Sequence, residues 1–329
     1  MKSGRIGGEP GQTASFHSHL NEAAGNSELP AVSFGRESRG RCGIGPATYH
    51  AGVNERPIIT MLTDFGLDGA VAACKGVILS ICREAQIVDV AHTIRKYSTR
   101  DGAWIMRAVL PYQPVGTHVG VVDPGVGTPR LPIGILTGRG DVLIGPDNGL
   151  LIPPAEVLGG ISAVRVLDNR GLWLPVATST FHGRDIFSPV AAHLAAGDAP
   201  FEAVGTELDP DDLVRLADPE PVVREDALET QVIYVDSFGN IRLAGTRDAL
   251  VAAIGDPTER SVAVEFAGNG AHGPVREATM FRPTFGAVEL GRSLLYVDSS
   301  GNLALADNQG NAAARLGITP GRAVRITLA

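Results

Sequence analysis

Apolar residues change their spacing along the chain and divide it into three segments. Residues 1–55 mix Gly, Ser, Asn and Glu with no apolar period, and such a segment buries too little surface to offset the entropy of ordering it. Short apolar runs then alternate with stretches of helical spacing, and toward the C-terminus the predicted elements are mostly strands. We therefore expect a disordered extension over residues 1–55, an N-terminal α/β domain over 56–215 and a smaller C-terminal domain over 216–329.

The N-terminal domain shows an alternation of predicted strands and helices. Short apolar runs and helical spacing predict, in turn, strands over residues 57–63, 86–90 and 117–123, and helices over residues 70–85, 98–110 and 187–197. The run at 98–110 opens with Ser-x-x-Asp, which is similar to a capping box. Residues 133–138 and 141–146 flank a Gly-Arg-Gly turn and predict a hairpin at one side of the sheet. This βαβαβ order is typical of an α/β domain with a largely parallel sheet.

The C-terminal domain follows a segment, residues 209–229, that is acidic and interrupted by proline, as linkers often are. Strand-like runs then cover residues 230–245, 261–268, 293–307 and 323–329. These runs predict a small β-barrel or sandwich with one or two short helices. YVDSFGNI and YVDSSGNL share one hairpin pattern, and eight residues do not distinguish an internal repeat from shared turn chemistry.

Composition narrows the classes of partner. The net charge of −8 gives no electrostatic case for nucleic acid or an anionic membrane. No apolar run approaches the ~20 residues that span a bilayer, and the N-terminus lacks the apolar core of a signal peptide, so we expect a cytoplasmic protein. Cys42, Cys74 and Cys82 are too few and too widely spaced for a disulfide framework or a zinc site.

Polar clusters follow the predicted strands at the edge where ligands bind in open α/β sheets. They cover residues 63–66, 123–130, 145–149 and 180–185. Turn and capping chemistry explains each cluster singly, but it does not require the His and Arg residues found there. Two kinds of site use such groups. One is a divalent metal site for phosphoester hydrolysis, with the oxygen and nitrogen ligands Asp64, Asp123, Asp147, Asp185 and His182. The other is a metal-free site in which an Asp binds a ribose and an Asp/Arg/His group holds a water.

The order of the motifs is more specific than any one of them. LTDFG, KGVI, VDPGVGTPR, GPDNGLL, TFHGRDIFSPVAA, YVDSFGNI and SSGNLALAD together resemble the SAM hydroxide adenosyltransferases, also described as (R)-S-adenosyl-L-methionine (SAM) hydrolases. These are relatives of the SAM-dependent fluorinase and chlorinase, and the resemblance runs from Pro57 to the C-terminus. It implies an α/β domain followed by a β-barrel, in a homotrimer that binds SAM between subunits. It also implies that water converts SAM into adenosine and methionine, so that SAM is the substrate and neither metal nor cofactor is needed.

The resemblance also implies roles for particular residues. Asp123, Arg130 and His182 match the triad that handles the water. The residues that match or adjoin the family's substrate-binding positions are Asp64 with its neighbour Phe65 at the ribose, Asn240 with Asp236 and Phe238 at the adenine, and Ser299 in the later hairpin.

One departure concerns the methionine end of SAM. The family usually has Leu-Glu-Ile-Ala where this chain has Leu-Ala-Leu-Ala, so the carboxylate at position 304 is missing. We include Asp307 among the substrate-binding residues because its carboxylate is nearby, although regular strand alternation places it on the face opposite Ala304. The family Tyr near residues 284–286 is also Phe here.

Three other functions stay open from the residues. A chlorinase is the nearest, but fluorinases and chlorinases replace the DPGVGTxR turn and lack the His of FHGRD, which favours water as the nucleophile here. The metal-dependent phosphoesterase is the second. The third is a non-catalytic SAM or adenosine sensor, which binds the ligand without turnover. The absence of the family glutamate at position 304 is consistent with it.

Overall fold

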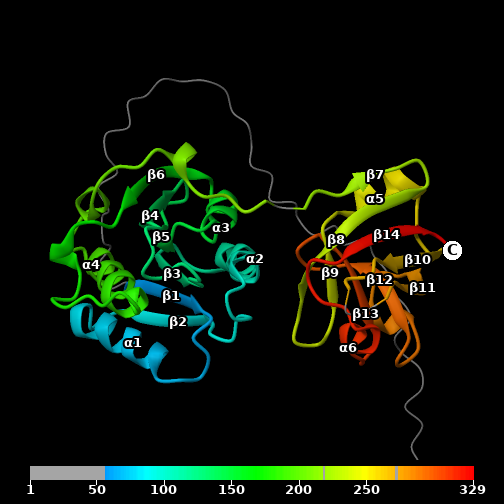
Figure 1. The fold of residues 1–329 in the computed structure, drawn as a ribbon, viewed down its shortest axis with the longest axis horizontal. Coiled ribbons are helices and arrows are strands. Elements are labelled where there is room, and N and C mark those ends of the chain that lie inside the picture. The colour runs from blue at the N-terminus through cyan, green and yellow to red at the C-terminus, as the bar shows by residue number, and fades with distance from the viewer. Residues whose placement is uncertain (1–55, 218, 271–272) are drawn as a thin grey trace, which may run out of the picture. The chain divides into compact units, whose positions relative to one another are not determined.

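The computed structural model describes residues 56–217, 219–270 and 273–329 (Figure 1). The predicted disordered extension over residues 1–55 lies outside the described residues. No helix in the described ranges is long and apolar enough to cross a membrane.

A mixed, mostly parallel sheet forms the N-terminal domain and confirms the predicted α/β class. Its strand order is β2-β1-β3-β5-β4-β6. The strands are β1 (Ile58–Thr63), β2 (Gln86–Ala91), β3 (Thr117–Val121), β4 (Pro132–Thr137), β5 (Val142–Pro146) and β6 (Ile161–Val166). Strands β2, β1, β3 and β5 pair in parallel, whereas β4 pairs antiparallel with both β5 and β6. The predicted hairpin is therefore present as β4–β5. The sequence analysis did not predict β6, which pairs with the other edge of β4 and forms the edge of the sheet.

Helices cover both faces of this sheet (Figure 1). They are α1 (Ala70–Ile81), α2 (Thr99–Val109), α3 (Ile152–Val157) and α4 (Ser188–Ala196). One apolar core contains Ile59 of β1 with residues of α1 and α4, and the other contains Leu62 of β1 with residues of α2 and α3. Alternate residues of β1 thus enter opposite cores, as expected of a strand buried on both faces.

The predicted Ser-x-x-Asp start of α2 forms one of the two hydrogen bonds of a capping box. Ser98 is the N-cap, and its Oγ accepts from the backbone N–H of Asp101 (3.4 Å). In a full capping box the acidic residue returns a bond to the N-cap N–H. Here Asp101 instead binds the guanidinium of Arg95 at 3.0 and 3.1 Å.

The C-terminal domain is a closed seven-stranded β-barrel, in which β14 pairs with β8. Its strands are β8 (Ala227–Val235), β9 (Ile241–Leu243), β10 (Ser261–Phe266), β11 (Val275–Phe281), β12 (Ser293–Val297), β13 (Leu303–Asp307) and β14 (Ala323–Leu328), with the short β7 (Val222–Val223) beside β8. Two helices, α5 (Arg247–Ile254) and α6 (Ala312–Leu316), pack against the barrel core. The predicted small β domain is confirmed as a barrel, to which β11 adds a strand that the sequence analysis did not predict.

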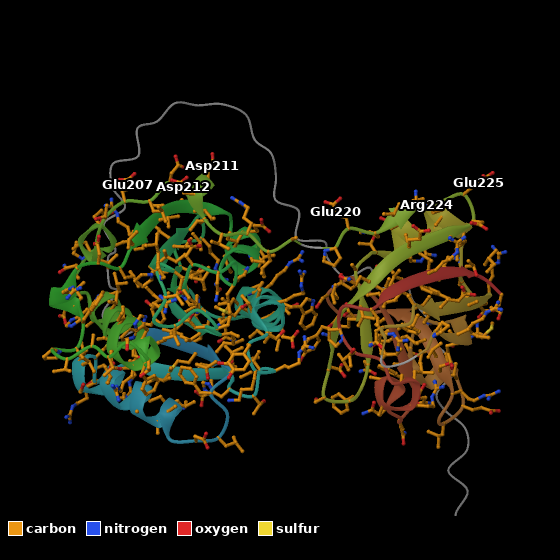
Figure 2. All side chains as sticks on the ribbon, in the orientation of Figure 1. Glu207, Asp211, Asp212, Glu220, Arg224 and Glu225 are labelled. Carbon is orange, nitrogen blue, oxygen red and sulfur yellow. The ribbon has the colours of Figure 1, made fainter. Side chains whose placement is uncertain are left out.

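The acidic segment ahead of the barrel carries its charges on the surface. Figure 2 labels Asp211, Asp212, Glu220 and Glu225 on this segment, and all four side chains are exposed. Its described residues, 209–217 and 219–229, include the short η5 (Pro210–Asp212), β7 and the start of β8. Like charges that remain in water cost little, and proline limits helix and strand formation there.

The two similar hairpins of the barrel have the same turn. In each, the Asp N–H donates to the Asn carbonyl, at 3.2 Å for Asp236–Asn240 and 2.8 Å for Asp298–Asn302. In each, the Asp Oδ1 accepts from the Asn N–H at 2.9 Å. The hairpins adjoin through the antiparallel β9–β13 pair, and Arg242 lies 3.7 Å from Asp236 and 3.0 Å from Asp298. The shared sequence pattern therefore corresponds to a shared local structure.

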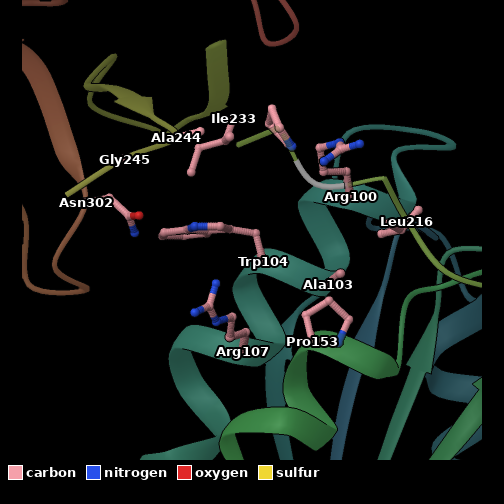
Figure 3. Close-up of a pocket in the computed structure, with 11 residues that line it drawn as sticks. Arg100, Ala103, Trp104, Arg107, Pro153, Leu216, Ile233, Ala244, Gly245 and Asn302 are labelled. Atoms are coloured by element: carbon pink, nitrogen blue, oxygen red, sulfur yellow. The ribbon is translucent and has the colours of Figure 1, made fainter. Parts of the chain in front are cut away.

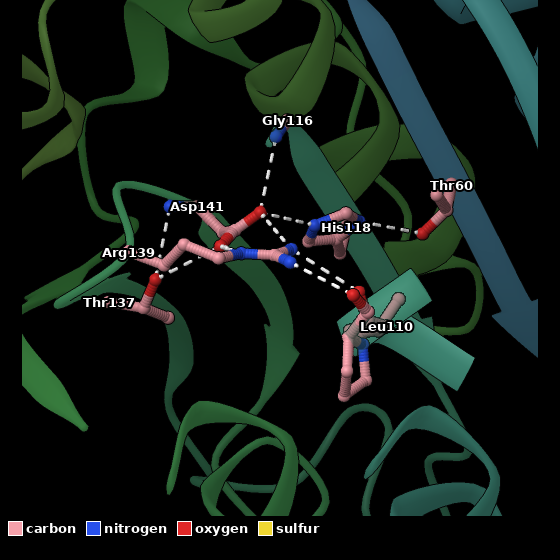
Figure 4. Close-up of polar contacts among 8 residues, drawn as sticks. Thr60, Leu110, Gly116, His118, Thr137, Arg139 and Asp141 are labelled. Carbon is pink, nitrogen blue, oxygen red and sulfur yellow. Dashed lines mark hydrogen bonds and ion pairs between the residues drawn. The ribbon is translucent and has the colours of Figure 1, made fainter. Parts of the chain in front are cut away.

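A buried polar network lies toward the amino ends of β1, β3 and β5 (Figure 4). His118 and Asp141 are fully buried, and His118 Nε2 is 2.9 Å from Asp141 Oδ1. The other ring nitrogen of His118 is 2.9 Å from Thr60 Oγ1. Arg139 donates to both oxygens of Asp141, at 2.7 and 2.9 Å. Burial opposes ionisation of Asp141, but the hydrogen bonds and charges of His118 and Arg139 outweigh it and hold the pKa of Asp141 well below its usual value.

Candidate active site

The polar clusters predicted from the sequence come together at the carboxyl edge of the sheet. Asp64 follows β1 and Asp123 follows β3. His182 immediately precedes the π-helical segment η3 (Gly183–Phe187), which leads into α4. Single turns of π-helix are rare and occur frequently at functional sites.

Asp123, Arg130 and His182 form one hydrogen-bonded chain. Arg130 Nε donates to the two oxygens of Asp123 at 3.0 and 3.1 Å, and Arg130 Nη2 also binds Asp123 Oδ2. The same Nη2 lies 2.9 Å from His182 Nδ1. The guanidinium lies over the ring of Phe187, 5.3 Å from its centroid. Asp123 therefore binds Arg130, and Arg130 in turn contacts His182.

These contacts determine which ring nitrogen of neutral His182 carries the proton. An arginine side chain only donates hydrogen bonds, so His182 Nδ1 must accept, and the neutral ring carries its proton on Nε2. Burial, and then the positive charge of Arg130, lower the pKa of His182 below its usual 6.5, against smaller opposing effects of Asp123 and Asp185. The imidazole is therefore neutral at neutral pH and has one basic nitrogen, Nδ1.

One donor of the triad is not used within the described part of the chain. Arg130 Nη1 is buried and makes no hydrogen bond there. The side chain of Arg130 is only 9% exposed. A buried donor without a partner is unfavourable by about 1–3 kcal/mol, which a bound acceptor at that position removes. Nη1 is thus a position at which a water or another small acceptor gains a hydrogen bond beside His182.

Close backbone packing holds the segments of the triad together. A Cβ on Gly127, in the turn between Asp123 and Arg130, would meet the carbonyl oxygen of Ser179 at 2.8 Å, and the φ of Gly127 is +79°. A Cβ on Gly183 would meet the ring of Phe65 at 2.8 Å. The positive φ of Gly127 and the Ser179 carbonyl favour glycine there, and Gly183 lets the FHGRD segment approach the ring of Phe65. The DPGVG turn thus packs on the segment just before FHGRD, and FHGRD packs on the residue after Asp64.

Asp64 is held in place by two residues that the sequence analysis did not single out. Tyr97 N–H donates to Asp64 Oδ2 at 2.9 Å, and Lys96 Nζ donates to the Asp64 carbonyl oxygen at 2.5 Å. Tyr97 has a φ of 64°, which is rare for a bulky residue, and its side chain is 72% exposed. Phe65 packs edge to face on Phe181, with ring centroids 5.6 Å apart.

The predicted adenine-binding residues lie together in the β8–β9 turn. Asp236 accepts from the backbone of Phe238 and Asn240, and its Oδ2 accepts from Asn240 Nδ2 at 2.9 Å. Phe238 is 75% exposed, an unusual position for so large an apolar ring. Ser299 is exposed in the matching β12–β13 turn. The structure therefore forms two groups of predicted site residues, one in each domain.

Asp307 is bound by another residue of the barrel. Arg315 donates to its two oxygens at 2.8 and 2.7 Å, and Asp307 is only 5% exposed. The β12–β13 register has no bulge, so Asp307 faces away from Ala304. Ala304 is itself fully buried, packed with Tyr296 and other apolar residues.

The carboxylates considered as metal ligands are engaged separately. Asp185 binds Thr178 and Arg184, and Asp147 accepts from the backbone N–H of Val214 at 3.0 Å. Within residues 56–217, 219–270 and 273–329, no three His, Cys, Asp or Glu side chains gather as a metal-binding group. This geometry gives no support to the metal-dependent alternative.

A cavity beside α2 contains none of the predicted site residues (Figure 3). Its volume is about 190 Å³, and Trp104, Arg107, Ile233 and Asn302 are among its lining residues. Pockets for drug-sized ligands usually measure ~300–1,000 Å³. The candidate active site is therefore assigned from the triad and not from this cavity.

Two family models match this chain. Residues 59–205 match the model of the SAM hydroxide adenosyltransferase N-terminal domain, and residues 230–325 match the model of its C-terminal domain. The chain belongs to the SAM hydroxide adenosyltransferase family.

Similar proteins are named either (R)-S-adenosyl-L-methionine hydrolase or fluorinase. A protein of Salinispora tropica named (R)-S-adenosyl-L-methionine hydrolase is 44% identical over 275 residues, covering 82% of this chain and 98% of the relative. A protein of the same name from Thermus thermophilus is 36% identical over 280 residues, covering 82% and 99%. A fluorinase of Actinopolyspora mzabensis is 30% identical over 304 residues, covering 83% and 97%.

A solved structure of similar fold comes from Thermotoga maritima. It is an uncharacterized conserved protein with a TM-score of 0.73 and 33% identity, and the match covers 82% of this chain and 99% of that one. The likeness extends over both domains that place the family motifs.

Proposed function

We propose that this protein hydrolyses SAM, with the R-sulfonium epimer as the preferred substrate, and that it does so in the cytoplasm as the sequence predicts. The observation that carries the proposal is the Asp123–Arg130–His182 chain in the family's own motifs. Membership of the family and the 44% identity to a named hydrolase support the substrate.

The reaction needs alignment and one proton acceptor. The oxygen of a water forms a bond to the ribose C5′ while the C5′–S bond breaks and its electron pair stays on sulfur. Methionine thus leaves as a neutral thioether, so no acid is needed to expel it. The water loses one proton, and adenosine and methionine are the products.

The residues of the triad divide this work. Arg130 Nη1, the buried donor that has no partner among the described residues, is the group we propose to bind the water oxygen. The water proton passes to His182 Nδ1, which becomes available when the Arg130 hydrogen bond to it opens. Asp123 keeps the guanidinium fixed through two oxygens. A placed general base typically contributes about 10²–10⁴-fold, and alignment contributes several kcal/mol more.

The remaining predicted residues bind the substrate in this proposal. Asp64 accepts from the ribose hydroxyls, with Phe65 beside it, and the exposed ring of Phe238 packs on adenine. Asn240 presents its Oδ1 to the exocyclic amine, since Asp236 already holds its Nδ2. Ser299 donates to the methionine end. Asp307 is not used, because Arg315 occupies both of its oxygens.

We propose further that the active protein is a homotrimer with its sites at subunit interfaces. The proposal combines the triad of one subunit with the barrel turn of its neighbour. Light scattering tests the trimer, and mixing two inactive variants tests the shared site. His182→Ala and Asn240→Ala are each expected to be inactive, whereas a mixture refolded together regains activity at hybrid sites with both native halves. A mixture that stays inactive, although both variants form trimers, would refute the shared site.

The deciding experiment for the function is product analysis. The purified protein is incubated with separated (S)- and (R)-SAM in chloride buffer containing EDTA and ¹⁸O-labelled water. Labelled adenosine with methionine is the expected result, and faster loss of (R)-SAM is expected. Chlorodeoxyadenosine as product would favour the chlorinase, and intact SAM would favour the sensor or the metal-dependent enzyme.

A further inference from the structure

The geometry around η3 points to Asp185 as a positioning residue, which fixes the loop that carries His182 against the triad. The effect of Asp185 on catalysis rests on the proposed function. The structural part of the inference, that Asp185 holds His182 in place, stands on contacts among the described residues.

Asp185 is a fully buried carboxylate with a complete set of donors. Its Oδ2 accepts from the backbone N–H of Thr178 at 2.8 Å and from Thr178 Oγ1 at 2.6 Å. Arg184 Nε donates to its Oδ1 at 2.6 Å, and Arg184 Nη2 donates to its Oδ2 at 3.0 Å. A buried charge with this many hydrogen bonds is held in one position, and everything bonded to it shares that position.

The backbone of Asp185 binds the same loop at a second point. An α-helix would use the Asp185 carbonyl oxygen to accept from the N–H of residue 189, but Pro189 has none. That carbonyl instead accepts from the Leu174 N–H at 3.0 Å. The local helix is π-helical, with Ser188 N–H bonded to the Gly183 carbonyl oxygen. The loop between residues 174 and 182 is therefore tied to Asp185 by both its side chain and its main chain.

The tied loop bears directly on the triad. Ser179, one residue after the Asp185 contact at Thr178, supplies the carbonyl oxygen that packs on Gly127 in the DPGVG turn. Phe181 lies under the Arg184 guanidinium, 4.7 Å from its carbon to the ring centroid. His182 follows at once. Release of the Asp185 contacts would thus loosen the two partners of Arg130, Asp123 and His182. The β8–β9 turn, and with it the proposed adenine binding, would stay in place.

The charge of Asp185 also acts on the imidazole. Arg130 lowers the pKa of His182, and Asp123 and Asp185 raise it, the effect of Asp185 being the smallest of the three. Burial is the largest cause of the lowered pKa, and release of the loop by Asp185→Asn reduces that burial while it removes only the smallest charge effect, so the pKa of His182 is expected to rise toward its usual value. A residue that acts on stability alone would not shift this titration.

The chain offers a matched control for the same kind of contact. Asp168 accepts from the Thr206 N–H at 2.9 Å and from Thr206 Oγ1 at 2.7 Å, as Asp185 does from Thr178. This pair is exposed and follows β6, outside the triad segments. Asp168→Asn and Thr206→Val therefore remove the same kind of Thr–Asp contact at an exposed position, without touching His182.

The test measures kcat and KM for (R)-SAM and the His182 titration by NMR in each variant. Asp185→Asn is expected to lower kcat about 10- to 100-fold with KM unchanged, as expected when a reacting group is misplaced by about 1 Å. Thr178→Val, which removes a single exposed hydroxyl, is expected to lower kcat about threefold and to keep the fold. The two control variants are expected to stay within about twofold of the wild type.

Two results would overturn the inference. One is a wild-type kcat and an unshifted His182 titration in both Asp185→Asn and Thr178→Val. The other is an equal loss in Asp168→Asn, which would show a general effect on stability. If Asp185→Asn does not fold, Thr178→Val decides by the same two measurements. Failure of the proposed function is distinguishable, because the wild type then leaves SAM intact while the titrations still report whether Asp185 acts on His182.

Discussion

The N-terminal domain contains two Asp–Arg–His groups, and strand β3 joins them. His118 lies near the start of β3 and belongs with Asp141 and Arg139, whereas Asp123 lies just after its end and belongs with Arg130 and His182. In both groups an arginine binds the carboxylate through two nitrogens.

The two groups differ in what they leave unpaired. In the buried group both ring nitrogens of His118 have partners, and Asp141 is fully enclosed. In the other group Arg130 keeps a buried nitrogen without a partner in the described chain, and His182 is partly exposed. Residue types alone therefore do not identify a catalytic group. Our proposal therefore rests on the second group, which has a donor unpartnered among the described residues at the edge of the sheet where ligands bind in open α/β folds.

The largest expected effect separates the two histidines by activity. His182→Ala is expected to lower kcat by about 10²–10⁴-fold, because it removes the proton acceptor, and to leave the unfolding midpoint within about 2 °C of the wild type. His118→Ala is expected to do the reverse, with a lower midpoint and a normal kcat per folded molecule. Steady-state kinetics beside calorimetry checks both. The distinction fails if His118→Ala loses activity while its midpoint is unchanged.

The next effect concerns the free energy of unfolding. Asp141→Asn removes the charge that His118 and Arg139 face, and breaking a buried pair in this way costs about 3–5 kcal/mol. Arg139 is 28% exposed, so water can solvate its unpaired charge and reduce this cost. We therefore expect the free energy of unfolding, measured in urea, to fall by about 3 kcal/mol. Asp168→Asn, at an exposed carboxylate, is the control, with an expected change below about 1 kcal/mol. An equal change in both variants would contradict the assignment of Asp141 to stability.

The pH dependence of activity tests the state of His182. Its pKa lies below 6.5, so the neutral base persists as the pH falls past that value. We expect kcat/KM to be level near neutral pH and to fall at lower pH with a single apparent pKa below 6.5. Initial rates from roughly pH 5 to 8 measure it. An acid limb with an apparent pKa above 6.5 would exclude His182, as placed here, from the role of base.

The smallest expected effect comes from the outer partner of the buried group. Thr60→Val removes the hydroxyl on His118 and leaves a buried ring nitrogen without a partner, which costs about 1–2 kcal/mol. Urea unfolding measures the loss, and activity is expected to be unchanged. The double variant Thr60→Val, Asp141→Asn is expected to lose less than the sum of the single variants, because both act on His118. Full additivity would show that the three residues do not form one network.

Much of the fold followed from apolar spacing, and its failures have a physical cause. The buried parallel strands are continuous apolar runs, so β1 and β3 were predicted near their observed bounds. β11, with the sequence VREATMF, alternates polar and apolar residues only in part, and its assignment depends on pairing with β10. The family motifs predicted the three residues of the triad, but the order of their contacts depends on how two segments, the turn over residues 123–130 and the segment that ends at His182, pack together.

Other features of the site depend on distant parts of the chain. The left-handed backbone of Tyr97 has no sequence signal, because tyrosine does not favour that conformation. The occupation of Asp307 depends on where α6 places Arg315. The role of Asp185 was likewise hidden, since a GRD sequence before a helix reads as an ordinary cap until Thr178 is seen to reach it.

Cys74 gives the segment behind His182 a chemical marker of its own. This thiol lies on α1, which packs on η3 and α4, and it is fully enclosed. Burial raises its pKa to about 11, so very little thiolate is present at neutral pH. Alkylation of Cys74 therefore requires α1 to separate from its neighbours. The alkylation rate, mapped by peptide mass, reports how often α1 separates from η3, the segment that follows His182, in the native protein.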